Sequence, residues 1–547
     1  MKSRLCTLLH ALAPRRRHAA GCVAMATALA LAVGGYGGPG TRDPVAPSTG
    51  FRLAPLPAGP APHDIAHIVF ILEENRSFDN LFGRFPGADG VTTATVTVGQ
   101  NHTTIPLVPE PYYLWHDLGH DHGDALGAIH GGKMDGFSHE TYSDIFGEKA
   151  AYQQLRPQDV PNLYAYAHAF TLSDRTFASL PASTFPNHLH TVAAQDGGAL
   201  GNPQNSTNAW GCDSIKGSYV LIQQAHGHVT GGFPCFSFTT LADRLTQAHI
   251  SWTYYSAPPS DIGYIWSTLD AFKQIRQTLQ WTQHVTDERS FEVDARAGRL
   301  PAFSWVTPRA AGSMHPPVPV CPGENWIVGK LNALMSGPDW NNTLVVLAWD
   351  DWGGYYDHVA PPPRAGGAYG PRVPLLIISP YARRGYVTHT VYTFESVLKT
   401  AETLWHLAPL TQLDGSANDL LDSLDLTQAP LPPLLLRPRA CAPAPTRAQD
   451  RALLDQALQR VMTQVLGLTL PEIVALHQAF SLAQIAALRN VRPAALSAAL
   501  KAAAQAWAGG EVMLQYIGPD QVGPETLKAA QSIDRLLQAP PGTRLFQ

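Results

Sequence analysis

The run His67-Ile-Val-Phe-Ile-Leu72, followed at once by Glu73-Glu74-Asn75-Arg76, decides the fold of this chain. A short apolar run rich in β-branched residues that ends abruptly in polar residues is typical of a buried parallel strand. The run Thr343-Leu-Val-Val-Leu-Ala-Trp349 repeats the pattern and leads into Asp350-Asp351. Two such runs predict a parallel sheet with acidic side chains at the carboxyl ends of its strands.

Alternation of strands and helices continues between and after these two runs. Further strands are predicted at 250–255, 302–306 and 373–379, and helices at 238–248, 268–280, 326–336 and 394–404. This alternation predicts an α/β fold, with a mostly parallel sheet sandwiched by helices. In such sheets the ligand site lies beyond the carboxyl ends of the strands.

The composition excludes several classes of protein. The 547 residues include 45% hydrophobic and 9% aromatic residues, enough for a large core rather than a disordered chain. The 46 glycines and 46 prolines argue against a coiled coil or a simple helical bundle. Because 38 basic and 43 acidic residues give a net charge of −5, nucleic acid is not an expected partner. The oligomeric state is not determined by the sequence.

Four regions are predicted along the chain. Residues 1–40 resemble an export signal, because the basic cluster Arg15-Arg16-Arg17-His18 precedes a short apolar stretch. That stretch is too short and alanine-rich for a stable membrane span. Export by the twin-arginine or the ordinary secretory route, to the periplasm or outside the cell, is therefore expected. A linker at 41–62 and a catalytic domain at 63–428 follow.

The fourth region, 429–547, is predicted to be a Pro-rich tether at 431–445 followed by a helical appendage. Stretches with helical periodicity fall at 450–466, 470–480, 482–489 and 494–508. The region contains no grouping of acids and histidines. A stabilising or docking module is expected there, with lipid or cell-wall binding as the alternative.

The cysteines fit an oxidising compartment. Cys6 and Cys22 lie in the predicted signal, which leaves Cys212, Cys235, Cys321 and Cys441. Three pairings are possible, and Cys212 with Cys235 requires only a local loop closure. Four free, buried thiols are the alternative. Because no Cys-x-x-Cys spacing occurs, a cysteine zinc site is not expected.

Oxygen donors follow both of the apolar runs that predict the central strands. Glu74 and Asn75 follow the first run, and Asp350 and Asp351 follow the second. A single acid after a strand is commonplace, but these four residues come from distant parts of the sequence and are predicted to converge. Converging carboxylates repel one another unless a cation compensates them. The grouping therefore predicts a site for a divalent cation.

Four motifs give the chain a family resemblance. They are Glu74-Asn-Arg-Ser-Phe-Asp79, then Asp117-Leu-Gly-His120 with Gly131-Gly-Lys-Met-Asp-Gly-Phe137, then Pro181-Ala-Ser-Thr-Phe-Pro-Asn187, and finally Trp349-Asp-Asp-Trp-Gly-Gly-Tyr-Tyr-Asp-His358. In this order they resemble the phosphoesterase family of bacterial phospholipases C and secreted acid phosphatases, which have an alkaline-phosphatase-like core. The resemblance covers about 63–409.

The resemblance implies a metal-dependent phosphoester hydrolase that acts through a phosphothreonine at Thr184. It implies one divalent ion, with Ca²⁺, Mn²⁺ and Mg²⁺ not distinguished. The ligands it implies are Glu74, Asn75, Thr184, Asp350 and Asp351. Independently of the family, a cation at a threonine oxygen would make that weak nucleophile reactive near neutral pH. The alternative for Thr184 is a turn-capping role before Pro186.

Three histidines complete the catalytic residues implied by the resemblance: His120, His315 and His358. An imidazolium can balance phosphoryl oxygens and donate a proton to the leaving group. For His358 the alternative is to orient Asp350. Two neighbours are assigned structural roles: Asp79 is predicted to cap a helix, and Arg76 to anchor the acid cluster.

The substrate follows less directly from the sequence. Asp351 and His188 stand where phospholipase-like members commonly have glutamate and arginine, and Phe85-Pro-Gly-Ala-Asp-Gly90 also departs from their usual continuation. These departures favour a phosphomonoesterase of the acid-phosphatase type. Aromatic residues that could instead form a choline or lipid pocket favour the alternative, a phospholipase C: Trp210, Tyr219, Trp252, Tyr254, Tyr255, Trp266 and Trp352. A non-catalytic secreted binding protein is the second alternative.

Overall fold

A computed structural model describes residues 65–98, 101–112, 114, 117–139, 149–206, 208–224, 227–364, 367–443, 447–500 and 537–542. The predicted export signal and linker lie outside the described residues, as does the second half of the helix predicted at 494–508. None of the described helices is long and apolar enough to cross a membrane.

The sheet is mostly parallel, as predicted. Eight strands of the described chain form it, in the order β10 (Val285–Asp287), β9 (Trp252–Ser256), β11 (Phe303–Val306), β1 (His67–Glu73), β12 (Thr343–Trp349), β15 (Leu375–Ile378), β6 (Thr171–Ser173) and β16 (Tyr386–Thr388). Strand β12 is buried along its whole length, and β1 is buried from its second residue. Such continuous apolar strands are typical of a sheet covered on both faces.

Strand β15 runs antiparallel to both of its neighbours, β12 and β6. Between β12 and β15 the described chain forms only a small hairpin of β13 (Pro363–Arg364) and β14 (Gly367–Ala368). A parallel pairing would require a long crossover, usually a helix. The direction of β15 therefore follows from its connection to β12.

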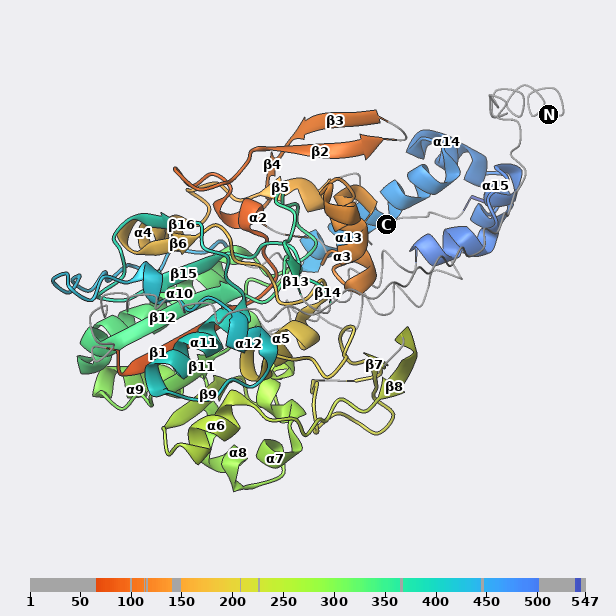
Figure 1. Ribbon diagram of the computed structural model, residues 1–547. Coiled ribbons are helices and arrows are strands. Elements are labelled where there is room, and N and C mark those ends of the chain that lie inside the picture. The colour runs from red at the N-terminus through yellow and green to blue at the C-terminus, as the bar shows by residue number, and fades with distance from the viewer. Residues whose placement is uncertain are drawn as a thin grey trace, which may run out of the picture. The chain divides into compact units, whose positions relative to one another are not determined.

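Two groups of helices flank the sheet (Figure 1). Helices α4 (Pro161–Ala169), α9 (Ser290–Ala297) and α10 (Val320–Met335) form one group, and α5 (Thr184–Ala193), α6 (Leu241–Gln247), α11 (Phe394–Trp405) and α12 (Gln412–Ser416) form the other. The helices predicted at 238–248, 326–336 and 394–404 correspond to α6, α10 and α11.

The single helix predicted at 268–280 is wrong. The chain forms a 3₁₀ turn at Thr268–Ala271, then α7 (Lys273–Arg276) and α8 (Leu279–His284). The break lies at Phe272, which has extended backbone angles, is fully buried and forms a β-bridge with Phe236. Packing of this phenyl ring overrides the local helical pattern.

Smaller elements complete the described structure. They are α2 (Phe78–Phe82), α3 (His122–Ile129), the hairpins β2 (Thr93–Val98) with β3 (Asn101–Pro106) and β7 (Val220–Gln223) with β8 (Val229–Gly232), and the pair β4 (Val108–Pro109) with β5 (Gln153–Gln154). The predicted C-terminal helices form as α13 (Arg447–Leu466), α14 (Leu470–His477) and α15 (Leu482–Leu488).

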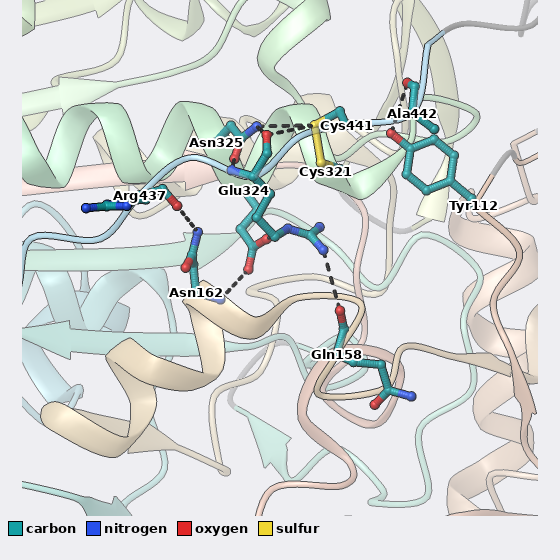
Figure 2. Close-up of a disulfide and its surroundings, with 10 residues drawn as sticks. Tyr112, Gln158, Asn162, Cys321, Glu324, Asn325, Arg437, Cys441 and Ala442 are labelled. Carbon is teal, nitrogen blue, oxygen red and sulfur yellow. Dashed lines mark hydrogen bonds and ion pairs between the residues drawn. A yellow bond between two sulfur atoms is a disulfide. The ribbon is translucent and has the colours of Figure 1, made fainter.

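Two disulfides join the cysteines of the described chain, Cys212 to Cys235 and Cys321 to Cys441. The first is the local closure that the sequence favoured. The second fixes the end of the Pro-rich segment to the first turn of α10 (Figure 2). Both bonds are consistent with an oxidising compartment.

The Pro-rich segment, here called the strap (residues 431–443), is not a free tether. Asn325 of α10 pairs through its side-chain amide with the backbone of Arg439, accepting from its nitrogen at 2.7 Å and donating to its oxygen at 2.8 Å. Asn332, two turns further along the helix, pairs in the same way with Leu436. The Arg439 guanidinium also lies 2.5 Å from the buried Glu324 carboxylate. The strap is therefore bound along α10 (Figure 2).

Candidate active site

The ends of β1 and β12 bring the predicted acids together. The two strands pair in parallel register up to Glu73 opposite Trp349, and the Asp350 nitrogen donates to the Glu73 carbonyl at 3.0 Å. Glu74 and Asp350 are therefore the first residues beyond neighbouring strand ends. Adjacent parallel strands place their carboxyl ends at one edge of a sheet, which is why residues far apart in sequence meet here.

The left-handed backbone conformation of Asn75 allows the side chains of Glu74 and Asn75, although consecutive, to lie at the same edge of the sheet. Asn75 has φ 57°, a conformation that asparagine tolerates better than most residues. Its backbone nitrogen donates to Asp350 Oδ1 at 3.0 Å, and its Nδ2 lies 3.2 Å from His120 Nε2. Gly353 packs so closely here that a Cβ atom would lie 2.7 Å from the Asn75 carbonyl oxygen. The turn is held by both strands.

Helix α5 supplies the predicted nucleophile. The helix begins at Thr184 after the extended residue Ser183, and Pro186 falls in its first turn, where proline is tolerated. The Asn187 side chain ties this turn together, because Nδ2 donates to the Ala182 carbonyl at 2.8 Å and Oδ1 accepts from the Leu180 nitrogen at 3.0 Å. Thr184 is 1% exposed.

His188 connects this helix to the acids. Its Nε2 lies 2.9 Å from Glu74 Oε1 and 3.7 Å from Asp350 Oδ2. Residues four apart on a helix lie on the same face, with their Cβ atoms about 5–6 Å apart. Thr184 therefore lies one turn from an imidazole that contacts the acid cluster. In the sequence, His188 stands out only as a departure from the family pattern; its i+4 spacing from Thr184 is the signal that could have identified it.

Glu74, Asp350 and Asp351, here called the acid cluster, are buried, and burial raises the free-energy cost of ionising each carboxyl group. Glu74, Asp350 and Asp351 are each 0% exposed. Burial, followed by the charges of Asp350 and Asp351, raises the pKa of Glu74 well above its ordinary value. Burial and Asp350 do the same to the pKa of Asp351. Protein atoms alone thus do not compensate three carboxylates at this edge.

The residues present fit a bound cation. Glu74 Oε2, Asn75 Oδ1, Asp350 Oδ2 and Asp351 Oδ2 are buried oxygens without a hydrogen-bond partner. Arg76 does not neutralise them, since its guanidinium pairs with Glu110 at 3.2 Å and donates to the Met314 carbonyl at 2.8 Å. Four unsatisfied oxygen donors at one sheet edge are the kind of ligand set that a divalent cation requires. Arg76 was predicted to anchor the acid cluster, but only its backbone nitrogen contacts it, donating to the Asp351 carbonyl at 3.0 Å. The sequence did not single out Glu110, the partner of the guanidinium.

A histidine pair lies beside the cluster. His120 Nε2 lies 3.9 Å from Asp351 Oδ2, and both His120 Nδ1 and His315 Nε2 lie 3.8 Å from Asp117 Oδ2. Burial alone would lower the pKa of His120, but the Asp351 and Asp117 carboxylates raise it to about 9. Asp117, quoted only as part of a motif, is the residue that joins the two imidazoles.

A cavity of about 520 Å³ opens at His120 and at Ser183, the residue before Thr184. This volume suits a small-molecule ligand. Its lining is mostly polar or small, with three leucines: Leu118, Gly119, His120, Asp121, His122, Gly123, Asp124, Ser183, Leu200, Gly201, Asn202, Gln204 and Leu221. The acid cluster is not part of this lining.

His358 lies in a different network. Its Nδ1 is 2.7 Å from Asp79 Oδ2 and its Nε2 is 3.2 Å from Asp89 Oδ1. The neighbouring Asp357 pairs with the buried Arg372 at 2.8 Å. No described contact joins His358 to Asp350. The helix-cap prediction for Asp79 is wrong, because Ser77 caps α2 by accepting from the Asn80 nitrogen, and Asp79 bonds to His358 instead.

Several known proteins are similar to this chain over most of its length. A family model described as the phosphoesterase family matches residues 65–408. Phospholipase C A of Mycobacterium tuberculosis is 27% identical over 437 residues, covering 68% of this chain and 80% of that protein. Non-specific phospholipase C3 of Arabidopsis thaliana is 29% identical over 378 residues, covering 60% of this chain and 66% of that protein. A protein of the alkaline phosphatase superfamily from Vibrio parahaemolyticus aligns at 13% identity and TM-score 0.32, covering 66% of this chain and 71% of that one.

Proposed function

Because the chain belongs to the phosphoesterase family, and is thus a hydrolase that acts on phosphoester bonds, we propose that it is a phosphomonoesterase that uses Thr184 as its nucleophile. One divalent cation would be held by Glu74, Asn75, Thr184, Asp350 and Asp351. Family membership leaves no reason to retain the alternative of a non-catalytic binder.

The lining of the cavity carries the choice of a monoester. None of the described residues around it is phenylalanine, tyrosine or tryptophan, the side chains against which a choline headgroup is usually held. Of the seven aromatic residues that the sequence offered for such a pocket, five are at most 2% exposed and belong to the core: Trp252, Tyr254, Tyr255, Trp266 and Trp352. The polar groups that remain are the imidazole, amide and hydroxyl groups, which suit a phosphoryl group, and the carboxylates of Asp121 and Asp124, of which Asp121 caps helix α3.

The proposed reaction is an in-line attack of the Thr184 oxygen on phosphorus, with the leaving alkoxide on the opposite side. The bond from phosphorus to the leaving oxygen breaks as the threonine bond forms, and water then hydrolyses the phosphothreonine from the other face. The bound cation would supply a lower proton affinity at the hydroxyl and charge for the phosphoryl oxygens. His120 would stabilise the equatorial oxygens or protonate the leaving oxygen, with His315 beside it.

The test compares p-nitrophenyl phosphate with p-nitrophenyl phosphorylcholine, using the parent protein, Thr184→Ala and Thr184→Ser. We expect turnover of the monoester by the parent, a loss of at least about 10³-fold in kcat for Thr184→Ala, and partial retention for Thr184→Ser, which keeps a hydroxyl. Full activity of the alanine variant would refute the nucleophile, and exclusive hydrolysis of the diester would refute the monoester.

A phospholipase C is the second candidate, favoured by the named relatives and by one surface feature. In the hairpin of β7 and β8, Gln223 pairs with Val229 and Leu221 with Gly231, so alternate residues share a face. Tyr219, Leu221, Val229 and Phe233 lie on that face, each between 37% and 46% exposed. Leu221 also lines the cavity.

An exposed apolar face at the rim of the cavity would suit contact with a lipid surface. Sedimentation with phosphatidylcholine vesicles and hydrolysis of these vesicles test this. The hairpin variant carries Leu221→Ser and Phe233→Ser, and the matched control is Leu488→Ser, a change of an exposed leucine at the end of α15. Vesicle hydrolysis that falls only in the hairpin variant would favour the phospholipase.

We further propose that the protein is exported. The basic and apolar pattern of residues 1–40 and the two disulfides support this location, because disulfides persist mainly in oxidising compartments. Cell fractionation with a thiol assay of both cysteine pairs tests it; reduced protein in the cytoplasm would contradict it.

A further inference from the structure

We propose that His188 binds the cation through Nε2, so that the site selects a transition metal such as Mn²⁺, Fe²⁺ or Zn²⁺ over Ca²⁺ and Mg²⁺. The inference rests on the cation site of the proposed function. It adds a nitrogen donor to a set that the sequence predicted to contain oxygen alone.

The distances fit ligands of one ion. Donors about 2.1 Å from a metal in octahedral positions lie about 3.0 Å from their neighbours. Nε2 of His188 is 2.9 Å from Glu74 Oε1 and 3.7 Å from Asp350 Oδ2. One donor atom from each of these three residues lies within 4.8 Å of the others, and all three residues are buried. The first separation is that of adjacent positions around a small cation, and the second lies between the separations of adjacent and of opposite positions.

The other side of the imidazole fixes its orientation. Nδ1 of His188 lies 3.1 Å from Thr268 Oγ1 and faces the Trp266 carbonyl. A carbonyl oxygen can only accept, and Thr268 Oγ1 itself donates to the same carbonyl at 3.4 Å. With the Thr268 proton directed at that carbonyl, the ring proton lies on Nδ1 and is donated to Thr268 Oγ1, which leaves the Nε2 lone pair directed at Glu74 and Asp350. Metal-bound histidines are commonly held in this way by a partner at the second nitrogen.

A simple hydrogen bond from Nε2 to Glu74 is the competing explanation. It would place the ring proton on Nε2, with Nδ1 accepting from Thr268 Oγ1 and the Trp266 carbonyl accepting from Tyr254 Oη. It would also leave Glu74 Oε2 and Asp350 Oδ2 unsatisfied, as they are without an ion. A metal bond accounts for these two oxygens as well as for the ring, and a simple hydrogen bond does not.

A nitrogen donor changes which ion the site prefers. Imidazole suits Zn²⁺, Fe²⁺ and Mn²⁺, whereas Ca²⁺ and Mg²⁺ prefer oxygen alone. An arginine at position 188, as the family resemblance leads one to expect, could not bind a metal at all. Replacement of arginine by histidine thus exchanges a fixed positive charge for a ligand.

The experiment uses full-length protein stripped with a chelator and reloaded. Pulsed EPR of the Mn²⁺ form should show the nitrogen coupling of a bound imidazole, and competition should show Mn²⁺ binding at least about 10-fold more tightly than Ca²⁺ or Mg²⁺. His188→Gln should lose the coupling and weaken Mn²⁺ binding by roughly 10- to 100-fold or more. His389→Gln, in an exposed histidine that contacts Asp174, is the matched control and should change neither.

Absence of nitrogen coupling in the parent, or coupling that persists in His188→Gln, would overturn the inference. Equal affinity of the parent for Mn²⁺ and Ca²⁺ would also overturn it, even if the variant did not fold. These readouts do not depend on turnover. Protein that shows the coupling but hydrolyses no phosphomonoester would sustain the ligand while refuting the proposed substrate.

Discussion

Removal of the disulfide that fixes the strap should destabilise the protein more than removal of the local one. Cys321 and Cys441 are 120 positions apart, and Cys212 and Cys235 are 23 apart. Loop-closure entropy for those lengths gives about 4.9 and about 3.4 kcal/mol of stabilisation at 25 °C. The double variant Cys321→Ser with Cys441→Ser should therefore lose about 1.5 kcal/mol more than Cys212→Ser with Cys235→Ser.

The contacts of the strap sharpen this expectation. Asn325 and Asn332 hold the strap through four hydrogen bonds that need no disulfide, so the native state of the variant should keep it docked. The loss then arises mainly in the unfolded chain. A unit the size of residues 60–547 unfolds with an entropy of about 1 kcal/mol per kelvin. The expected falls in Tm are about 5 °C and about 3.5 °C, respectively.

Differential scanning calorimetry of the oxidised parent and both double variants provides the assay, with intact mass confirming the disulfide state. Turnover should be unchanged in the Cys321–Cys441 variant, because neither cysteine lines the cavity. A larger fall in Tm for the local pair than for the strap pair would refute this reasoning, since loop length would then not determine the ranking.

Three further predictions concern the site and its surroundings. Chelation should abolish turnover and also lower Tm by a few degrees, because an ion present at 100 times its Kd stabilises the folded state by about 2.7 kcal/mol. An unchanged Tm after verified metal removal would contradict the acid cluster as the site of the ion. His358→Asn should lower Tm, because a lost hydrogen bond to a charged partner such as Asp79 costs about 1.5–3 kcal/mol. It should leave kcat for p-nitrophenyl phosphate within about threefold of the parent, because His358 does not contact Asp350; a fall in kcat with unchanged Tm would indicate a catalytic rather than a structural role for His358. Burial, together with Asp414, raises the pKa of Glu402 from 4.5 to about 8, so the folded state loses stability as pH rises from 4.5 to 8. The Tm of Glu402→Gln should therefore equal that of the parent near pH 4.5 and exceed it at about pH 8.5. Equal Tm values of the two proteins at both pH values would argue against the shift.

The sequence predicted the sheet because strands buried on both faces leave a continuous apolar run. It also predicted which acids converge, since polar residues after two such runs must meet at one edge if the strands are neighbours. It could not predict the strap, because proline-rich composition is the same in a free tether and in a segment bound by Asn325 and Asn332. Nor could it place His358, whose partner Asp89 lies in a loop 269 positions away.

Residues on α5 show why the site required the fold. Thr184 and His188 were both visible in sequence, but their common role depends on one helix face meeting the ends of β1 and β12. The far side of the same helix is held by His190, whose Nδ1 lies 2.5 Å from Glu395 Oε1, and Ser179 Oγ donates to the other oxygen of that carboxylate at 2.8 Å. Because α11, through Glu395, fixes α5, the proposed nucleophile and the proposed nitrogen ligand move as one body. A displacement of α5 should therefore alter the proposed metal binding and the proposed phosphoryl transfer together, so a variant that weakens the contact between α5 and Glu395 should affect both.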